Sequence, residues 1–142
     1  MTDISVFTQP LQAENLAWDL TPPHGGFDAQ GVIDVTSLTA AQHYPNGFLP
    51  SGTVLGIITA SGMLGPYLDA AADGRQTAVG ILKASVQILK PDFTAKAKVG
   101  CAYRVHGIVS SGKLPLTVGT AANGGYIDAN GKTDLKLIYF AA

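Results

Sequence analysis

The sequence predicts a mainly β protein: a small, compact domain of the β-barrel or sandwich type, with at most one or two short helices and an extended N-terminal arm. Its 17 glycines and 8 prolines in 142 residues follow no fixed period, which indicates many tight turns. Between those turns, the apolar residues form short β-branched stretches rather than helical repeats. Apolar side chains make up 46% of the chain, enough for one domain to fold without disulfides or a metal ion.

Residues 1–30 are expected to form the extended arm. Their prolines and the pair Gly25-Gly26 exclude a helix interior, because proline lacks a backbone donor and clashes with the preceding turn. Two alternatives are open for the arm: it packs on its own domain, or it becomes ordered on a partner. Trp18 is correspondingly a local core anchor or an interface anchor. The arm carries two apolar clusters, composed of Ile4, Val6 and Phe7 and of Leu16, Ala17, Trp18 and Leu20.

The β-rich domain is expected over residues 31–142 and begins with an alternating strand at Val32–Leu38. The pair Asn46-Gly47 then predicts a tight turn. The stretch Gly52–Ala60 is β-branched and apolar on both faces, so it is expected to be a buried strand. A short strand interrupted by glycine and proline follows at Met63–Leu68.

A glycine inside the next predicted strand, Gly80, indicates a bulge or the close approach of another backbone. In the longest predicted strand, alternation places Cys101 and Tyr103 on one face and Arg104 and His106 on the other, which is expected to be partly solvated or to face a partner. The remaining strands are expected at Gln76–Leu82, at Ser85–Leu89 as a continuation of the same sheet, at Lys98–Ser110 and at Leu135–Phe140.

The residues that could carry chemistry do not combine into an active site. Cys101 and His106 are five residues apart, so on a regular strand their side chains point to opposite faces. The carboxylates Asp69 and Asp73 are better explained by a turn, since Asp73 precedes Gly74. The three histidines lack metal-ligand spacing, and the stretch GTVLG lacks the ending of a phosphate loop. We expect no catalytic residue, no metal and no cofactor.

Charge and hydropathy limit the partners. The net charge is −1 and no cation cluster exceeds the pair Lys96/Lys98, so direct nucleic-acid binding is not expected. No apolar stretch has the length of a membrane helix, and the first residues do not resemble a signal peptide, so synthesis in the cytoplasm is expected. Charged residues make up only 13%, which suggests that much of the surface is covered by protein partners.

The stretch Leu49–Val86 resembles the lambda-like bacteriophage head decoration proteins, a family of capsid-stabilising proteins. Further likeness lies in Val105–Val109 with the following Lys113–Pro115, and in the last residues from Ile127 to Phe140. The motif residues occur in family order, as Gly52, Thr53, Leu55 and Gly56, then Asp73 and Gly74, then Val79, Gly80, Ile81 and Leu82.

The resemblance implies a structural protein without enzymatic activity. It implies a homotrimer that binds the major capsid protein on the outer surface of the expanded head and stabilises the shell against the pressure of packaged DNA. It also implies that the motif residues form a core near the trimer axis, and that any helix before the last strand is short, because Asn130 and Gly131 are poor helix formers. The protein would be made in the host bacterium and end in the virion. Contacts with the capsid are expected from the arm, at Ile4, Val6, Phe7, Leu16 and Trp18.

Two alternatives stay open at this point. One is another phage structural component, such as a tail or fibre-base protein, which would share the β texture and the oligomerisation. The other is a small β-barrel module that binds a ligand or acts as an enzyme, which requires a concave pocket with convergent polar groups. If the arm only contacts the shell, removing residues 1–20 should leave a folded protein that no longer decorates expanded heads.

Overall fold

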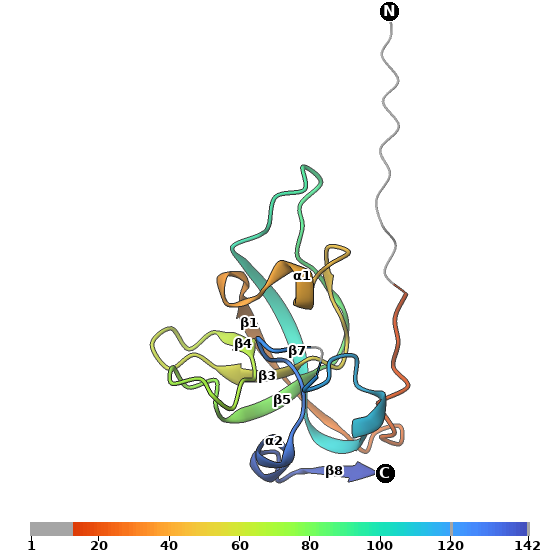
Figure 1. The fold of residues 1–142 in the computed structure, drawn as a ribbon. Helices are drawn as coiled ribbons and strands as arrows, with labels where there is room; N and C mark the ends of the chain where they lie inside the picture. Colours follow the sequence, from red (N-terminus) through yellow and green to blue (C-terminus); the bar gives the residue numbers. More distant parts are fainter. Residues whose placement is uncertain (1–12, 120, 142) are drawn as a thin grey trace, which may run out of the picture.

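In a computed structural model that describes residues 13–119 and 121–141, five strands close into a barrel and a sixth extends it (Figure 1). The mainly β fold with short helices that the sequence predicts is confirmed. The barrel strands are neighbours in the order β1-β4-β3-β5-β7, and β7 pairs back with β1. Their bounds, with that of β8 at the end of the sheet, are β1 Phe27–Asp34, β3 Val54–Ile57, β4 Leu64–Pro66, β5 Ala78–Leu82, β7 Lys98–Ser110 and β8 Ile138–Ala141.

Strand β7 has the bounds that the sequence predicts, and it organises the barrel. Its first half pairs antiparallel with β1, from Asp34 opposite Lys98 to Phe27 opposite His106. Its last four residues pair in parallel with β8. A strand of 13 residues without proline can donate and accept along its whole length, so β7 pairs with β1 and then with β8, and it also pairs with β5 at Tyr103 and Arg104.

The first strand starts and ends earlier than the sequence predicts. Strand β1 begins at Phe27, inside the stretch assigned to the arm, and it stops at Asp34 instead of continuing to Leu38. The Asp34 carboxylate accepts the backbone N–H of Thr36 at 3.0 Å and starts a 3₁₀ turn over Val35–Ser37. A side chain that bonds the backbone two residues ahead favours a turn over a strand.

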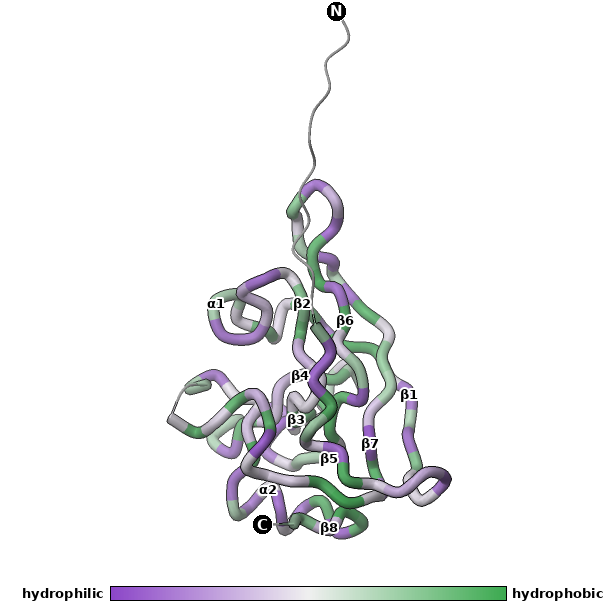
Figure 2. The backbone as a smooth tube through the Cα atoms, turned by 90° about the vertical axis from the view of Figure 1, so that its right-hand side faces the viewer, coloured by the Kyte–Doolittle hydropathy of each residue, from purple (hydrophilic) through white to green (hydrophobic). Residues whose placement is uncertain are grey.

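A second, two-stranded sheet stands at one end of the molecule. Strand β2 (Phe48–Leu49) pairs antiparallel with β6 (Val86–Gln87), and Figure 2 shows the two side by side beyond the barrel strands. The expectation that Ser85–Leu89 continues the main sheet is therefore wrong, because this stretch pairs with the residues that follow the predicted Asn46-Gly47 turn. Gly47 adopts φ +88° and donates to the carbonyl of Tyr44 at 3.0 Å, which confirms that turn.

The helices are short. Helix α1 spans Ala40–His43 and α2 spans Ala129–Asp134, and a second 3₁₀ turn covers Ser111–Lys113. Helix α2 is the short helix expected before the last strand. The Asp128 carboxylate caps it by accepting the N–H of Gly131 at 2.7 Å. Among the described residues, no helix has the length and apolarity needed to cross a bilayer.

Two apolar clusters form the core, one around Trp18, Tyr67, Ile81 and Val109 and one around Ile33, Leu55 and Leu82. Most family-motif residues are buried in this core of a single protomer. Gly80 is required by a close approach, as the sequence predicts. A Cβ there would lie 2.3 Å from a ring carbon of Tyr103 and 2.8 Å from the carbonyl of Arg104.

Candidate interaction surfaces

Residues Ala13–Gly26, here called the strap, lie along the last part of β7. The N–H of Leu20 donates to the carbonyl of Ile108 at 2.9 Å, and the N–H of Ser110 donates to the carbonyl of Trp18 at 2.8 Å. The strap therefore occupies the edge of β7 opposite β8. This second half of the predicted arm packs on its own domain, which is one of the two alternatives that the sequence left open.

Trp18 anchors the strap. Its side chain is 0% exposed in the first apolar cluster, and its Nε1 donates to Ser51 Oγ at 3.0 Å. Ser51 Oγ in turn donates to the carbonyl of Lys83 at 2.9 Å. In the protomer, Trp18 is thus the local core anchor, whereas Leu16 is 45% exposed and open to contact. The other predicted arm contacts, Ile4, Val6 and Phe7, lie outside the described residues.

A charged network fixes the strap to the barrel. Asp19 contacts Lys83 Nζ at 2.6 Å and Arg104 Nη2 at 3.3 Å, while Arg104 Nε contacts Asp28 at 2.6 Å. Burial raises the pKa of Asp19, but the hydrogen bonds from Lys83 and Thr21 and the charge of Arg104 outweigh it, so this pKa lies below its usual value. The Arg104 side chain, on the β7 face expected to be solvated or to meet a partner, is only 6% exposed because the strap covers it.

Sequence reasoning missed this network. Glycines make it possible: a Cβ on Gly26 would lie 2.3 Å from Arg104 Nη1, and one on Gly107 would lie 2.4 Å from Thr21 Oγ1. The available signal was an arginine in the middle of a largely apolar strand, together with an arm that carries an aspartate at position 19. Such a charge needs a partner when it is buried.

Among the described residues, the cysteine and the carboxylates considered above are held in contacts that serve the fold. Cys101 is half-buried, and burial raises the pKa of its thiol to about 11, which makes it a poor nucleophile. Asp73 pairs with Arg75 at 2.9 Å, while Asp69 accepts from Asn130 at 3.1 Å, so the two carboxylates have separate partners. Within residues 13–119 and 121–141, no three potential ligands gather where they could hold a metal ion.

His43 is buried and joins two loops. Its Nδ1 accepts the N–H of Thr39 at 2.7 Å, so its Nε2 carries the proton and donates to the carbonyl of Gly124 at 3.0 Å. Burial lowers the pKa of His43, and the charge of Arg75 acts in the same direction against the hydrogen bond to Gly124. The imidazole is therefore neutral and serves the fold.

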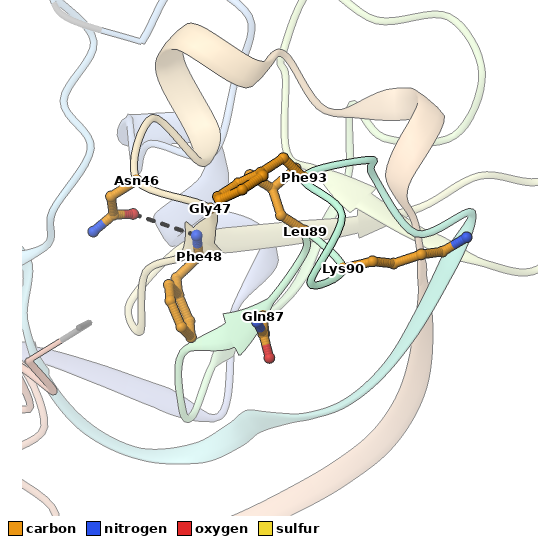
Figure 3. A pocket seen from close by; sticks show the side chains of 7 residues that line it. All are labelled: Asn46, Gly47, Phe48, Gln87, Leu89, Lys90 and Phe93. Carbon is orange, nitrogen blue, oxygen red and sulfur yellow. Dashed lines mark hydrogen bonds between the residues drawn. The ribbon is translucent and has the colours of Figure 1, made fainter. Parts of the chain in front are cut away.

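Two hollows share a wall at Asn46 and Phe48. The larger, here called the proline groove, has a volume of about 450 Å³. The smaller lies under the tip of the 88–97 loop, where Phe93 covers Gly47 and Leu89 (Figure 3), and its volume of about 20 Å³ is too small for more than a water molecule. The proline groove is lined by Gln42, His43, Pro45, Asn46, Phe48, Pro50, Pro115 and Leu116.

Apolar side chains also gather around the end of β7 nearest β8, in what is here called the basal patch. Phe27 is 65% exposed and lies opposite His106, while Tyr139 is 70% exposed and lies opposite Ile108. Leu20 and Leu137, also exposed, bond through their backbones to neighbouring positions of β7. In the described part of the chain, no strand pairs with the outer edge of β8.

Comparison with known proteins gives one family. The model of the family described as bacteriophage lambda head decoration protein D matches residues 26–125. This range contains strands β1 to β7, the proline groove and the family-motif residues, whereas most of the strap, α2 and β8 lie outside it. No curated protein matches the chain.

Proposed function

Because the chain belongs to the family of the bacteriophage lambda head decoration protein D, we propose that it forms a homotrimer that binds the major capsid protein on the outer surface of the expanded head. Bound there, it stabilises the shell against the pressure of packaged DNA. The observation that carries this proposal is the family match over residues 26–125, which spans the whole barrel. The same match names a head protein, which favours this function over a tail component or a ligand-binding module.

The surface supports adhesion over broad contacts. Charged residues make up 13% of the chain, so a large flat interface would desolvate few of them. Exposed apolar side chains are available at the basal patch and along the strap. Many copies on one shell, each binding modestly, can together stabilise it strongly without a deep pocket in any one of them.

The first residues supply a second kind of contact. Residues 1–12 contain Ile4, Val6 and Phe7 and a single charged side chain, Asp3. Such a segment can add as a strand to the edge of a capsid-protein sheet, where main-chain hydrogen bonds give affinity and alternate side chains give specificity. The strap holds the base of this segment on the barrel through Trp18.

The test is co-sedimentation with expanded and unexpanded shells, using the full chain and a variant that lacks residues 1–12. A deletion of residues 1–20 is unsuitable, because it removes Trp18 and Asp19 and so damages the fold itself. We expect the full chain to bind expanded shells only. The shorter variant should keep its melting temperature and the mass of a trimer, yet bind weakly or not at all.

Stabilisation is measured separately, by heating filled heads with and without the protein and following DNA release with a dye. Decorated heads should release DNA at a higher temperature. A protein of monomeric mass, or one that binds unexpanded shells equally well, would contradict the proposal. Full retention of binding after removal of residues 1–12 would refute the role of the first residues alone.

A further inference from the structure

The proline groove opens beside the place where the strap begins. Glu14 accepts the N–H of Ser85 at 2.7 Å and its hydroxyl at 3.1 Å. Ser85 Oγ also accepts the N–H of Ser51 at 3.1 Å, and Ser51 directly follows Pro50 of the groove. Hydrogen bonds between Glu14 and Ser85 and between Ser85 and Ser51 therefore connect the start of the strap to one wall of the groove.

A second path leads from the strap to the same groove. A Cβ on Gly52 would lie 2.7 Å from Pro115 and 3.1 Å from the Trp18 ring, so both side chains pack against this glycine. Trp18 is fully buried and bonded to Ser51, so one wall of the groove lies next to the residue that anchors the strap. The position of the groove relative to Ala13 is thus set by the fold.

The groove is uncharged. Among the residues that the structure describes, the lining contains no Asp, Glu, Lys or Arg, and His43 is held neutral because its Nδ1 accepts a backbone N–H. Its three prolines offer no backbone N–H, and Phe48 and Leu116 add apolar surface. A charged ligand would lose part of its hydration here without meeting an opposite charge, so the groove suits an uncharged, extended and partly apolar segment.

We propose that the proline groove is a second contact with the shell and binds an extended, uncharged segment of the major capsid protein, next to the place where that protein holds residues 1–12. This inference rests on the proposed function. Because residue 12 adjoins Ala13, a partner that holds the chain up to Leu11 comes within roughly 10 Å of Glu14. Because this connecting segment is short, the groove meets the bound partner at a high effective concentration.

Other surfaces fit this role less well. The hollow under Phe93 holds about 20 Å³, which is too small for a side chain. The basal patch lies around β8, whereas the strap starts away from that strand (Figure 1). A partner captured by residues 1–12 is therefore held nearer to the proline groove than to the basal patch.

The experiment adds one negative charge to the groove and keeps the backbone N–H contact that each substituted side chain accepts. In Gln42→Glu, the remaining oxygen still accepts the N–H of Asn123, which lies 3.0 Å from Gln42 Oε1. In Asn46→Asp, the carboxylate can still accept the N–H of Phe48, which lies 3.3 Å from Asn46 Oδ1 in the unaltered protein. The matched control is Gln76→Glu, whose Oε1 accepts the N–H of Gly74 at 2.8 Å in a turn outside the groove.

Affinity for expanded shells is measured for all three variants, together with melting temperature and the mass of the free oligomer. We expect Gln42→Glu and Asn46→Asp to weaken binding roughly tenfold or more, because each charge is desolvated without a partner, and Gln76→Glu to remain within about twofold. Melting temperature and oligomer mass should not change.

Each other outcome has a definite meaning. If the groove variants bind as well as the control while loss of residues 1–12 abolishes binding, the groove inference is wrong and the proposed function stands. If the groove variants alter the oligomer mass, the groove joins copies of this chain, which also overturns the inference. If the unaltered protein does not bind expanded shells, the proposed function itself fails.

Discussion

Replacement of Trp18 by alanine should be among the most damaging single changes in this protein, although the residue lies outside the barrel strands. The indole is fully buried and Nε1 donates to Ser51 Oγ. Loss of a buried tryptophan costs about 3–5 kcal/mol. Since small domains are stable by only about 5–15 kcal/mol, this is a large share of the total. The melting temperature should fall by roughly 10–15 °C for a chain of this size.

The assay is urea denaturation followed by far-UV circular dichroism at a fixed protein concentration. Leu16→Ala, which removes an exposed apolar side chain from the same strap, is the control and should change stability by less than about 0.5 kcal/mol. Trp18→Phe keeps most of the packing and removes the hydrogen bond, so it should fall between the two. If Trp18→Ala unfolds at the same urea concentration as the unaltered protein, Trp18 does not anchor the strap.

Three further predictions follow from the same contacts. Asp19→Asn should lower the free energy of unfolding by about 2 kcal/mol at pH 7, because Arg104 keeps only one carboxylate partner. The unaltered protein should lose this contribution as the pH falls below 3.8, the usual pKa of an aspartate, since the pKa of Asp19 is lowered in the folded protein. The neutral form of His43 is favoured by folding, so stability should fall as the pH drops below its usual pKa of 6.5, and His43→Gln should reduce that slope. Gly80→Ala should cost about 1–3 kcal/mol or more through its clash with strand β7, whereas Gly112→Ala, with nothing within 4 Å, should be nearly neutral.

Thermal melts recorded from pH 3 to pH 8 test the first two of these predictions, and melts at pH 7 test the third. An Asp19→Asn protein that loses stability between pH 5 and pH 3 as steeply as the unaltered protein would show that the Asp19 carboxylate adds no pH-dependent stability. For His43, an equal slope between pH 5 and pH 7 in the variant would mean that another group titrates there. For the glycines, equal melting temperatures of the two variants would disprove the close approach at Gly80.

The strands that could be predicted are those whose pattern is local. Lys98–Ser110 alternates over its full length and has no proline, so its bounds followed from the residues alone. The turn at Asn46-Gly47 and the close approach at Gly80 were likewise predicted. Glycine is favoured where φ is positive or where a Cβ would clash with a neighbouring residue. The family motif added the order of these pieces, and the family match supports it.

The errors came from choices between neighbours that are distant in the sequence. Val86 and Gln87 have the composition of a main-sheet strand, yet they pair with Phe48 and Leu49 in a separate sheet. The start of β1 follows a stretch rich in proline and glycine, so no local pattern indicates it. Residues Phe27–Gln30 form a strand because they pair with β7. The residue types of a segment indicate whether it forms a strand. The strand with which it pairs depends on which segments the fold brings beside it.

The residues alone were enough to predict the class of this protein, a β-rich chain with frequent turns, little charge and the ordered motif of a phage head family. The three-dimensional arrangement was needed to show where the N-terminal region divides, with Trp18 and Asp19 in the fold and Leu16 exposed. It also decided that Arg104 is covered and that three separate prolines line one groove. The physical reason is that burial and ion pairing are properties of residues brought together from far along the chain, and no local pattern records them.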